Sequence, residues 1–184
     1  MELKEAITGR RSIRKYKSTP VSQEQVETVI EAARQAPSWA NTQCWSFVVV
    51  RDSQTKNKLA ETLSQGNPAT DAVRTAPVVI VACAEIGKAG YYRGEPQTDK
   101  GDYWFMFDVA LALQNLTLAA YELGLGTVHV GLFDAQKAAR VIGVPKGTAV
   151  VELMPLGYPD EQPPARPRRE LAEIVFYEKY GQTR

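Results

Sequence analysis

The sequence predicts a single domain of mixed α and β structure, in which helices flank one β-sheet. Several segments carry apolar residues at helical spacing, and other short segments rich in aromatic and β-branched residues are typical of strands. Strands and helices alternate irregularly along the chain, which favours one sheet with helices around it. The 184 residues suit one domain that can bury a proper core. With no repeats and no second domain in view, we predict one domain over residues 1–184.

Predicted helices are recognised by their apolar stripes and by residues typical of helix ends. A short amphipathic helix near the N-terminus is expected to end at Gly9, a residue suited to a C-cap. Ser22 is the expected N-cap of a second helix, and Gln25, three residues further on, completes a capping box. Asp134 is the expected N-cap of a helix that ends at Gly143. Further helices are predicted over residues 53–65 and 108–123.

Four segments predict strands: residues 45–52, 76–85, 127–133 and 148–159. The second of them is apolar on consecutive residues, which indicates a strand covered on both faces. Residues 87–101 are rich in glycine and charge, and we interpret them as a loop. The tail from about residue 160 is rich in proline, then basic, then weakly patterned. This pattern predicts an arm rather than a core element.

Composition excludes several classes of protein. The formal net charge of +1 is too even for a general nucleic-acid binder. Two cysteines, Cys44 and Cys83, and the single His129 cannot supply the usual ligands of a zinc or iron–sulfur cluster. Two free thiols suit a reducing cytosol, and the N-terminus has no signal-peptide pattern. No stretch approaches the apolar length of a membrane span. We therefore expect a cytoplasmic protein without nucleic-acid or membrane partners.

The stretch "RRSIRKYK", residues 10–17, concentrates five basic residues in an otherwise balanced chain. A solvated loop is the ordinary interpretation of such a run. However, Arg10, Ser12 and Arg14 alternate, so an extended backbone would place all three on one face. Two guanidinium groups around a hydroxyl suit a phosphate monoester. A second cluster, "RPRR" at residues 166–169, repeats the alternation, and the two clusters could converge on one phosphate.

The familiar glycine-rich phosphate loops are absent from the sequence. No GxxxxGK[ST] motif occurs, so the chain is not a P-loop protein. "GLGTVHVG" begins at Gly124 and superficially resembles a dinucleotide fingerprint. Its glycines follow a predicted helix and precede a strand, which is the reverse of the Rossmann order, and His129 stands in place of the third glycine. We interpret Gly124 as a helix C-cap.

Five motifs occur in order: "RRSIRKY", "APSWANTQCWSFVVV", "GLGTVHVGLFD", "PLGYP" and "RPRRELAEIVFYEKYG". With them the chain resembles the nitroreductase family of flavoproteins from the first helix almost to the last residue. The resemblance implies an α+β fold with a central mixed β-sheet flanked by helices. It further implies an intertwined homodimer with FMN at the subunit interface, in which each subunit's C-terminal arm, residues 160–184, wraps the other.

The resemblance also assigns roles to residues. Arg10 and Ser12 are expected at the phosphate and ribityl end of FMN, and Arg14 at the pyrimidine edge of the flavin. Arg166 and Arg168 complete the phosphate site. The full implied set of cofactor-binding residues is Arg10, Arg11, Ser12, Arg14, Pro37, Ser38, Trp39, Asn41, Asn67, Gly131, Leu132, Arg166 and Arg168.

Other members of this set are expected around the isoalloxazine ring. The "PSxxN" segment, residues 37–41, covers the ring from the partner subunit. The backbone N–H of Gly131 points at flavin N5, and Asn67 contacts the ring. Trp39, His129 and Leu132 differ from the residues usual in the family. All three lie in segments that border the flavin, so the resemblance does not determine which acceptor is used.

We expect an oxidoreductase that takes a hydride from NADH or NADPH and passes electrons, in a ping-pong mechanism, to a nitroaromatic, a quinone or a related acceptor. The flavin carries the redox chemistry, so no catalytic residue is expected, while Arg14 and Gly131 tune the flavin. Cys44 and His129 as nucleophile and base are disfavoured, because a buried cysteine is usually inert. The alternatives are a flavin-binding redox sensor with little turnover, or a reductive dehalogenase like iodotyrosine deiodinase.

Overall fold

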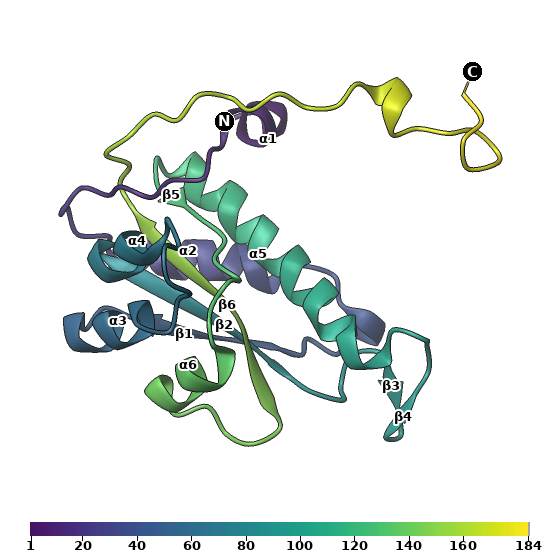
Figure 1. Ribbon diagram of the computed structural model, residues 1–184, viewed down its shortest axis with the longest axis horizontal. Coiled ribbons are helices and arrows are strands. Elements are labelled where there is room, and N and C mark those ends of the chain that lie inside the picture. Colours follow the sequence, from purple (N-terminus) through teal and green to yellow (C-terminus); the bar gives the residue numbers. More distant parts are fainter. Residues whose placement is uncertain (184) are drawn as a thin grey trace.

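The computed structural model describes residues 1–183 and has a four-stranded sheet at its centre (Figure 1). The strand order is β1–β2–β6–β5. The two central strands, β2 and β6, are also the longest, so the helices cover the part of the sheet with the longest strands. The strands are β1 (Trp45–Val50), β2 (Val78–Glu85), β5 (Gly126–Thr127) and β6 (Thr148–Gly157).

Neighbouring strands of this sheet are antiparallel, so the expectation of a mixed sheet is wrong for the named strands. The single parallel contact among the described residues is an isolated bridge between Ser12 and Thr127. The physical reason lies in the connections. The helices between β1 and β2 bring the chain back to the same end of the sheet at which β1 finishes. β2 starts at that end and therefore runs antiparallel to β1.

Helices cover both faces of the sheet (Figure 1). β2 is buried on both faces, as its unbroken apolar run predicts. Ile80 and Ala82 pack in one core, whereas Val79 and Val81 pack in the other. On the first face lie α2 (Gln23–Arg34) and α5 (Trp104–Glu122), and on the second lie α3 (Ser53–Ala60), α4 (Thr70–Thr75) and α6 (Ala135–Ile142).

The predicted capping of helices is confirmed except at Gly9. Ser22 and Gln25 form the expected capping box, and the carboxylate of Asp134 accepts from the backbone N–H of Lys137. In contrast, Gly9 is the last helical residue of α1 (Leu3–Gly9), and its φ is not positive. A side chain at Gly9 would collide with the Tyr121 hydroxyl of α5. Close packing of two helices, rather than chain reversal, therefore requires this glycine.

Residues 87–101 are more ordered than the predicted loop. They form a small antiparallel hairpin of β3 (Tyr91–Tyr92) and β4 (Glu95–Pro96). Arg93 and Gly94 both have positive φ at its turn, which is the geometry of a tight two-residue hairpin. The strand predicted over residues 127–133 is reduced to the end of β5 and two isolated antiparallel bridges, Val130 with Leu153 and Phe133 with Leu63.

Beyond residue 160 the chain leaves the sheet, passes α1 and extends past the rest of the molecule (Figure 1). This C-terminal arm contains one short 3-10 turn, Leu171–Glu173, and its side chains are mostly exposed. The tail is thus extended and exposed in this chain, and its role as an arm stays a prediction. Among the described residues, no helix has the combined length and apolar character needed to cross a membrane.

Candidate functional site

The basic segment of residues 10–17 is a pinned, extended chain rather than a solvated loop. The backbone N–H of Ile13 donates to Thr127 O at 2.9 Å, and that of Lys17 donates to Tyr158 O at 2.9 Å. Within the segment, the side chain of Tyr16 is half-buried, and its hydroxyl donates to Ile13 O at 2.6 Å. The two backbone bonds attach the segment to β5 and to the chain that follows β6, and the Tyr16 bond lies within the segment. The basic side chains therefore have a rigid base.

Glu161, at the start of the C-terminal arm, ties the arm to this segment. Its carboxylate accepts from the backbone N–H groups of Arg14 and Lys15. The backbone N–H of Asp160 donates to Lys15 O at 2.9 Å. A carboxylate on two backbone donors makes charge-assisted bonds, which are stronger than neutral ones. The arm is consequently held beside the basic segment from its first residues.

The two basic clusters meet around one hollow of about 600 Å³. The two clusters, whose convergence the sequence left open, therefore lie together within a single chain. Both the basic segment and the arm line this hollow. The polar and charged side chains that line it are Thr8, Arg10, Arg11, Ser12, Arg14, Arg166 and Arg168.

Arg10 is half-buried, and its environment is unfavourable for a cation. Its Nε is buried and has no hydrogen-bond partner among the described residues. Burial lowers the pKa of Arg10, and the positive charges of Arg168 and then Arg11 lower it further. A buried donor without a partner costs free energy, and so does a cation beside other cations. An anion in the hollow would relieve both costs.

Arg11 has a different role in this chain. Its Nη1 donates to three backbone carbonyls, those of Thr8, Gly9 and Arg10, at 2.8, 3.0 and 2.8 Å. These carbonyls lie at the C-terminal end of α1, where a positive charge is favourable. Arg11 therefore caps α1. Its predicted contact with the cofactor would compete with these bonds.

A second hollow, of about 190 Å³, adjoins the first because Arg14 lines both. Its walls include Asn67, which precedes α4, and the extended segment that holds Gly131 and Leu132. The Asn67 side-chain amide donates to Leu132 O at 3.0 Å, so the two walls are bonded to each other. A side chain built at Gly131 would meet no heavy atom within 4 Å. The space over Gly131 is therefore open.

His129 also lines the second hollow, and both nitrogens of its ring have partners. Its Nδ1 lies 2.6 Å from Glu152 Oε1, and its Nε2 lies 3.3 Å from Thr117 Oγ1. Because a carboxylate can only accept, the proton of a neutral ring is on Nδ1. The disfavoured pairing of His129 with Cys44 is absent, since Cys44 lies 3.8 Å from a carboxylate oxygen of Asp108 instead.

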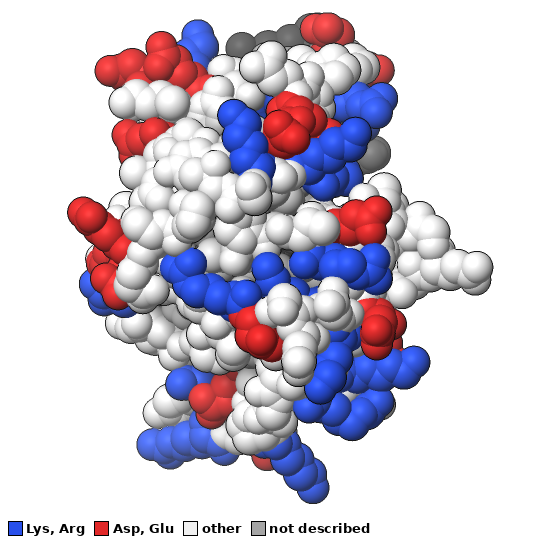
Figure 2. Space-filling model, turned by 90° about the vertical axis from the view of Figure 1, so that its left-hand side faces the viewer, with Lys and Arg blue, Asp and Glu red and all other residues white. Residues whose placement is uncertain are grey.

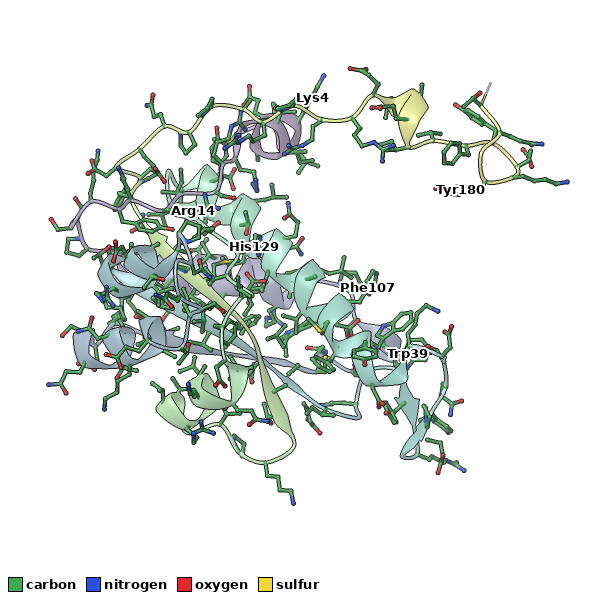
Figure 3. The ribbon with its side chains drawn as sticks, in the orientation of Figure 1. Lys4, Arg14, Trp39, Phe107, His129 and Tyr180 are labelled. Atoms are coloured by element: carbon green, nitrogen blue, oxygen red, sulfur yellow. The ribbon has the colours of Figure 1, made fainter. Side chains whose placement is uncertain are left out.

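The predicted ring-covering segment, residues 37–41, lies away from these hollows within one chain. Figure 3 shows Trp39 near Phe107, toward the opposite end of α5 from Arg14 and His129. The Trp39 backbone N–H donates to both carboxylate oxygens of Asp108, at 3.0 and 3.2 Å. The Trp39 ring packs edge-on against Trp104, with centroids 4.8 Å apart. Pro37, Ser38, Trp39 and Asn41 are therefore not joined to the other predicted residues in this chain.

Backbone geometry and a buried carboxylate hold this segment in place. Ala40, Asn41 and Gln43 all have positive φ, of 43°, 56° and 47°, which is costly for residues other than glycine. Asp108 is 1% exposed, and burial raises its pKa against the effect of the Trp39 N–H. Cys44 beside it is buried as well, which raises the pKa of its thiol to about 11. This cysteine is consequently a poor nucleophile.

The prediction from sequence missed the three carboxylates that organise these sites: Asp108, Glu152 and Glu161. Two of them leave a signal in the sequence. Asp108 is the single charge between Trp104 and Tyr121, and Glu152 is the single charge within β6. A lone carboxylate in an otherwise apolar element indicates a specific partner, because an unpaired buried charge is very costly. Glu161 has no comparable local signal.

Comparison with known proteins assigns the fold. The model of the nitroreductase family matches residues 7–73 and 65–158. The chain belongs to the nitroreductase family. A Bacillus subtilis FMN reductase [NAD(P)H] is 31% identical over 189 residues, covering 97% of this chain and 74% of the relative. An iodotyrosine deiodinase of Nematostella vectensis is 27% identical over 200 residues, covering 95% of this chain and 74% of the relative.

A solved nitroreductase-family structure has the same fold throughout. The Vibrio harveyi NADPH:FMN oxidoreductase, in complex with NAD+, superposes with a TM-score of 0.84 and 32% sequence identity. The match covers 99% of this chain and 79% of that chain. The α+β class is thereby confirmed.

Proposed function

We propose that the two adjoining hollows hold one FMN, and that the protein carries electrons from NADH or NADPH through it to a small-molecule acceptor. The chain is an NAD(P)H-dependent flavin oxidoreductase, as its family membership and its relatives indicate. One observation carries the position of the cofactor: Arg10, whose Nε is buried and unpartnered, lines a hollow that Arg166 and Arg168 of the arm also line. Such a set suits a phosphate.

The larger hollow fits the phosphate and ribityl parts of FMN. Arg10 and Arg168 bind the phosphate, and Arg166 adds a third cation. Ser12, between Arg10 and Arg14 in the basic segment, also lines the hollow and offers a hydroxyl that can both donate and accept. Each guanidinium presents donors in a planar fork, which matches phosphate oxygens better than an ammonium group does.

The smaller hollow fits the edge of the isoalloxazine ring. Arg14, at the junction of the two hollows, would face the pyrimidine part of the ring. The open space over Gly131 allows the ring to approach the backbone, so that the Gly131 N–H faces N5. Asn67 contacts the ring edge and, through its bond to Leu132 O, supports that backbone.

Bound FMN supplies the redox chemistry: it accepts a hydride from reduced nicotinamide and, in a second half-reaction, passes electrons to the acceptor. The chain positions the ring and stabilises charge. Arg14 offers a cation where negative charge develops on reduction, and stabilising charge that develops in the reaction speeds the step. A ping-pong order follows if nicotinamide and acceptor use the same face in turn. The acceptors we propose are nitroaromatics, quinones and related molecules.

We further propose a homodimer in which the arms are exchanged. The side of α5 near the hairpin exposes Met106 and Phe107, at 49% and 57%, beside Tyr103 at 72%. The arm exposes Leu171 and Ile174 at 73% and 51%. Exposed apolar patches of this kind mark interaction surfaces. In this arrangement residues 37–41 of the partner cover the flavin, which explains why they lie away from the hollows of their own chain.

The proposed setting is the cytoplasm, without nucleic-acid or membrane partners. Cys44 and Cys83 are both free and buried, as suits a reducing compartment. Figure 2 shows the side of the molecule near α3 and α4, where basic side chains are interspersed with acidic ones. An interspersed surface lacks the broad positive field that binds nucleic acid.

Flavin reduction under anaerobic conditions tests the proposed function. The purified protein is expected to be yellow, to bleach within seconds on addition of NADH or NADPH, and to recolour with a quinone or a nitroaromatic. A yellow protein that bleaches only over many minutes would favour a redox sensor. Recolouring by iodotyrosine alone would favour the deiodinase alternative, which the Nematostella vectensis relative supports. A colourless protein that takes up no added FMN would contradict the proposal.

A further inference from the structure

The flavin's own chemistry leaves one polar group of the smaller hollow without a role, the imidazole of His129. It is the only histidine of the sequence. Its side chain is 38% exposed, while its partner Glu152 is 17% exposed. Gly131, over which we propose that the flavin ring lies, is two residues further along the same extended segment. Both ring nitrogens of His129 are therefore bonded to the protein, while part of the ring remains exposed at the hollow.

The sheet places this pair with little freedom. Val130 pairs with Leu153 in antiparallel register, so Glu152 stands opposite Gly131, on the face that His129 shares. The backbone bonds between Val130 and Leu153 are both 3.1 Å long and fix that register. Glu152 is thus a rigid acceptor for Nδ1–H, which leaves Nε2 as the atom that can gain a proton.

Thr117, on α5, allows Nε2 to be occupied in either state. Its hydroxyl lies 3.3 Å from Nε2 and is buried, with the residue 3% exposed. A hydroxyl can donate to a neutral imidazole nitrogen and, after rotation, accept from a protonated one. The site therefore offers partners to the neutral ring and to the imidazolium alike. A ring that only fills space needs no such arrangement.

The charged groups facing His129 come from two elements. Glu152 of β6 contributes a negative charge, and Arg14 of the basic segment, across the hollow, contributes a positive one. α5 contributes the neutral Thr117, and the chain before α4 contributes the neutral Asn67. Among side chains, histidine is the one whose charge ordinarily changes near neutral pH. His129 is thus suited to respond when the charge in the hollow changes.

We propose that His129 is a redox-linked proton site of the flavin. When a hydride brings two electrons and one proton to the bound flavin, one negative charge remains in the hollow. His129 then takes up a proton from water at Nε2, and the imidazolium balances that charge. When the electrons leave with a hydride to the acceptor, His129 returns its proton to water. This inference rests on the proposed function and adds to it a proton-binding residue that does not itself exchange electrons.

The experiment follows the single imidazole by NMR. Protein labelled with 15N- and 13C-histidine and loaded with FMN gives one set of ring signals, which is recorded against pH in the oxidised state and again after anaerobic reduction. The midpoint of the titration is expected to rise by half a pH unit or more on reduction. An equal midpoint in both states would overturn the inference. The result does not depend on turnover.

The reduction potential provides the reciprocal measurement. For a two-electron couple each proton taken up adds ~30 mV per pH unit, which is the value of a tenfold change in equilibrium constant. Between the two titration midpoints of His129, the wild-type reduction potential is expected to fall more steeply with pH, by the additional ~30 mV per pH unit that one proton contributes. His129→Gln should lose this additional slope while retaining its FMN. A variant that keeps the slope would contradict the proposal.

Two further variants separate proton uptake from a merely structural role. Glu152→Gln keeps the ring but removes its negative partner, so both titration midpoints are expected to fall together. Thr117→Ser keeps the hydroxyl and is expected to behave like wild type. If the protein takes up no FMN, the proposed function fails and this inference with it. If the flavin binds and is reduced by NAD(P)H without a shift at His129, the inference alone fails.

Discussion

Arg10 and Arg168 come from opposite ends of the chain and line one hollow. Burial lowers the pKa of Arg10, and the charge of Arg168 is the next largest cause. Two cations held close together destabilise the protein unless an anion lies between them. The fold maintains this arrangement because Glu161 and the backbone of residues 158–160 attach the arm to the basic segment. In the function that we propose, the phosphate of FMN would be that anion.

The first prediction is that Arg10→Ala and Arg168→Ala each weaken FMN binding about tenfold or more. Each residue contributes a charge-assisted bond, typically ~1.5–3 kcal/mol, to the phosphate. Quenching of flavin fluorescence on titration measures the affinity. Arg169→Ala is the control, because Arg169 lies on the same arm but pairs with Glu173 instead. If both variants bind FMN as tightly as wild type, the phosphate does not bind in this hollow.

The second prediction concerns Arg14→Met, which keeps much of the apolar stem and deletes the cation. The variant is expected to retain most of its FMN, with a reduction potential lower by ~20–65 mV, corresponding to ~1–3 kcal/mol over two electrons. Reduction by NAD(P)H should also slow. Spectroelectrochemical titration measures the potential. Lys15→Met, an exposed neighbour, is the control, and equal potentials in all three proteins would place Arg14 away from the ring.

The third prediction separates the arginines of the arm from its apolar end. Truncation after Pro159 removes both and should yield flavin-free, poorly soluble protein. Truncation after Arg169 keeps Arg166 and Arg168 but removes the exposed Leu171 and Ile174, so it should bind FMN and form a weaker dimer. Light scattering coupled to gel filtration, with flavin absorbance, reads both properties. A soluble, yellow monomer from the shorter chain would rule out the exchanged arm.

The fourth prediction is a pH effect at Asp108. Burial raises its pKa in the folded chain, so the folded state keeps this proton to higher pH than the unfolded state does. We compare the free energy of unfolding of wild type with that of Asp108→Asn. The difference, wild type minus variant, should fall as pH rises from about 3.9 through the raised pKa, and should then stay level. Urea unfolding at several pH values measures this difference.

Asp134→Asn is the control for that measurement, because its effect has the opposite sign. The Lys137 backbone N–H, the first of several causes, lowers the pKa of Asp134. Wild type relative to Asp134→Asn should therefore gain stability as pH rises through the lowered pKa to the ordinary value and should lose it again on acidification. Identical profiles for both comparisons would contradict the assigned role of Asp108.

The fifth prediction tests the contact between the basic segment and β5. A Cβ at Gly126 would lie 2.6 Å from Ile13 Cγ1, so Gly126→Ala should lower the free energy of unfolding by ~1–3 kcal/mol. Gly131→Ala has open space and should leave the stability unchanged, whatever it does to the flavin. Urea unfolding of the flavin-free proteins compares them. Equal stabilities would mean that Ile13 can move aside.

Local features of this protein could be predicted from its sequence because short-range chemistry determines them. The Ser22–Gln25 capping box, the doubly buried β2 and the Asp134 cap depend on residues within one or two turns of each other. The alternation of Arg10, Ser12 and Arg14 likewise indicated a phosphate-binding segment, which stays a prediction. The resemblance to nitroreductases added residues 37–41 and Gly131, which no local pattern distinguishes from ordinary loop residues.

Contacts between distant segments were decided by the tertiary structure alone. Strand direction in the sheet, the packing of Gly9 against Tyr121, and the seating of His129 between Glu152 and Thr117 each join segments far apart in the sequence. Such contacts depend on how the whole sheet and α5 pack together. A sequence pattern specifies which face of an element is apolar, but it does not specify which distant element covers that face. For the same reason, the sequence determined the chemistry of the candidate site, and the fold determined its geometry.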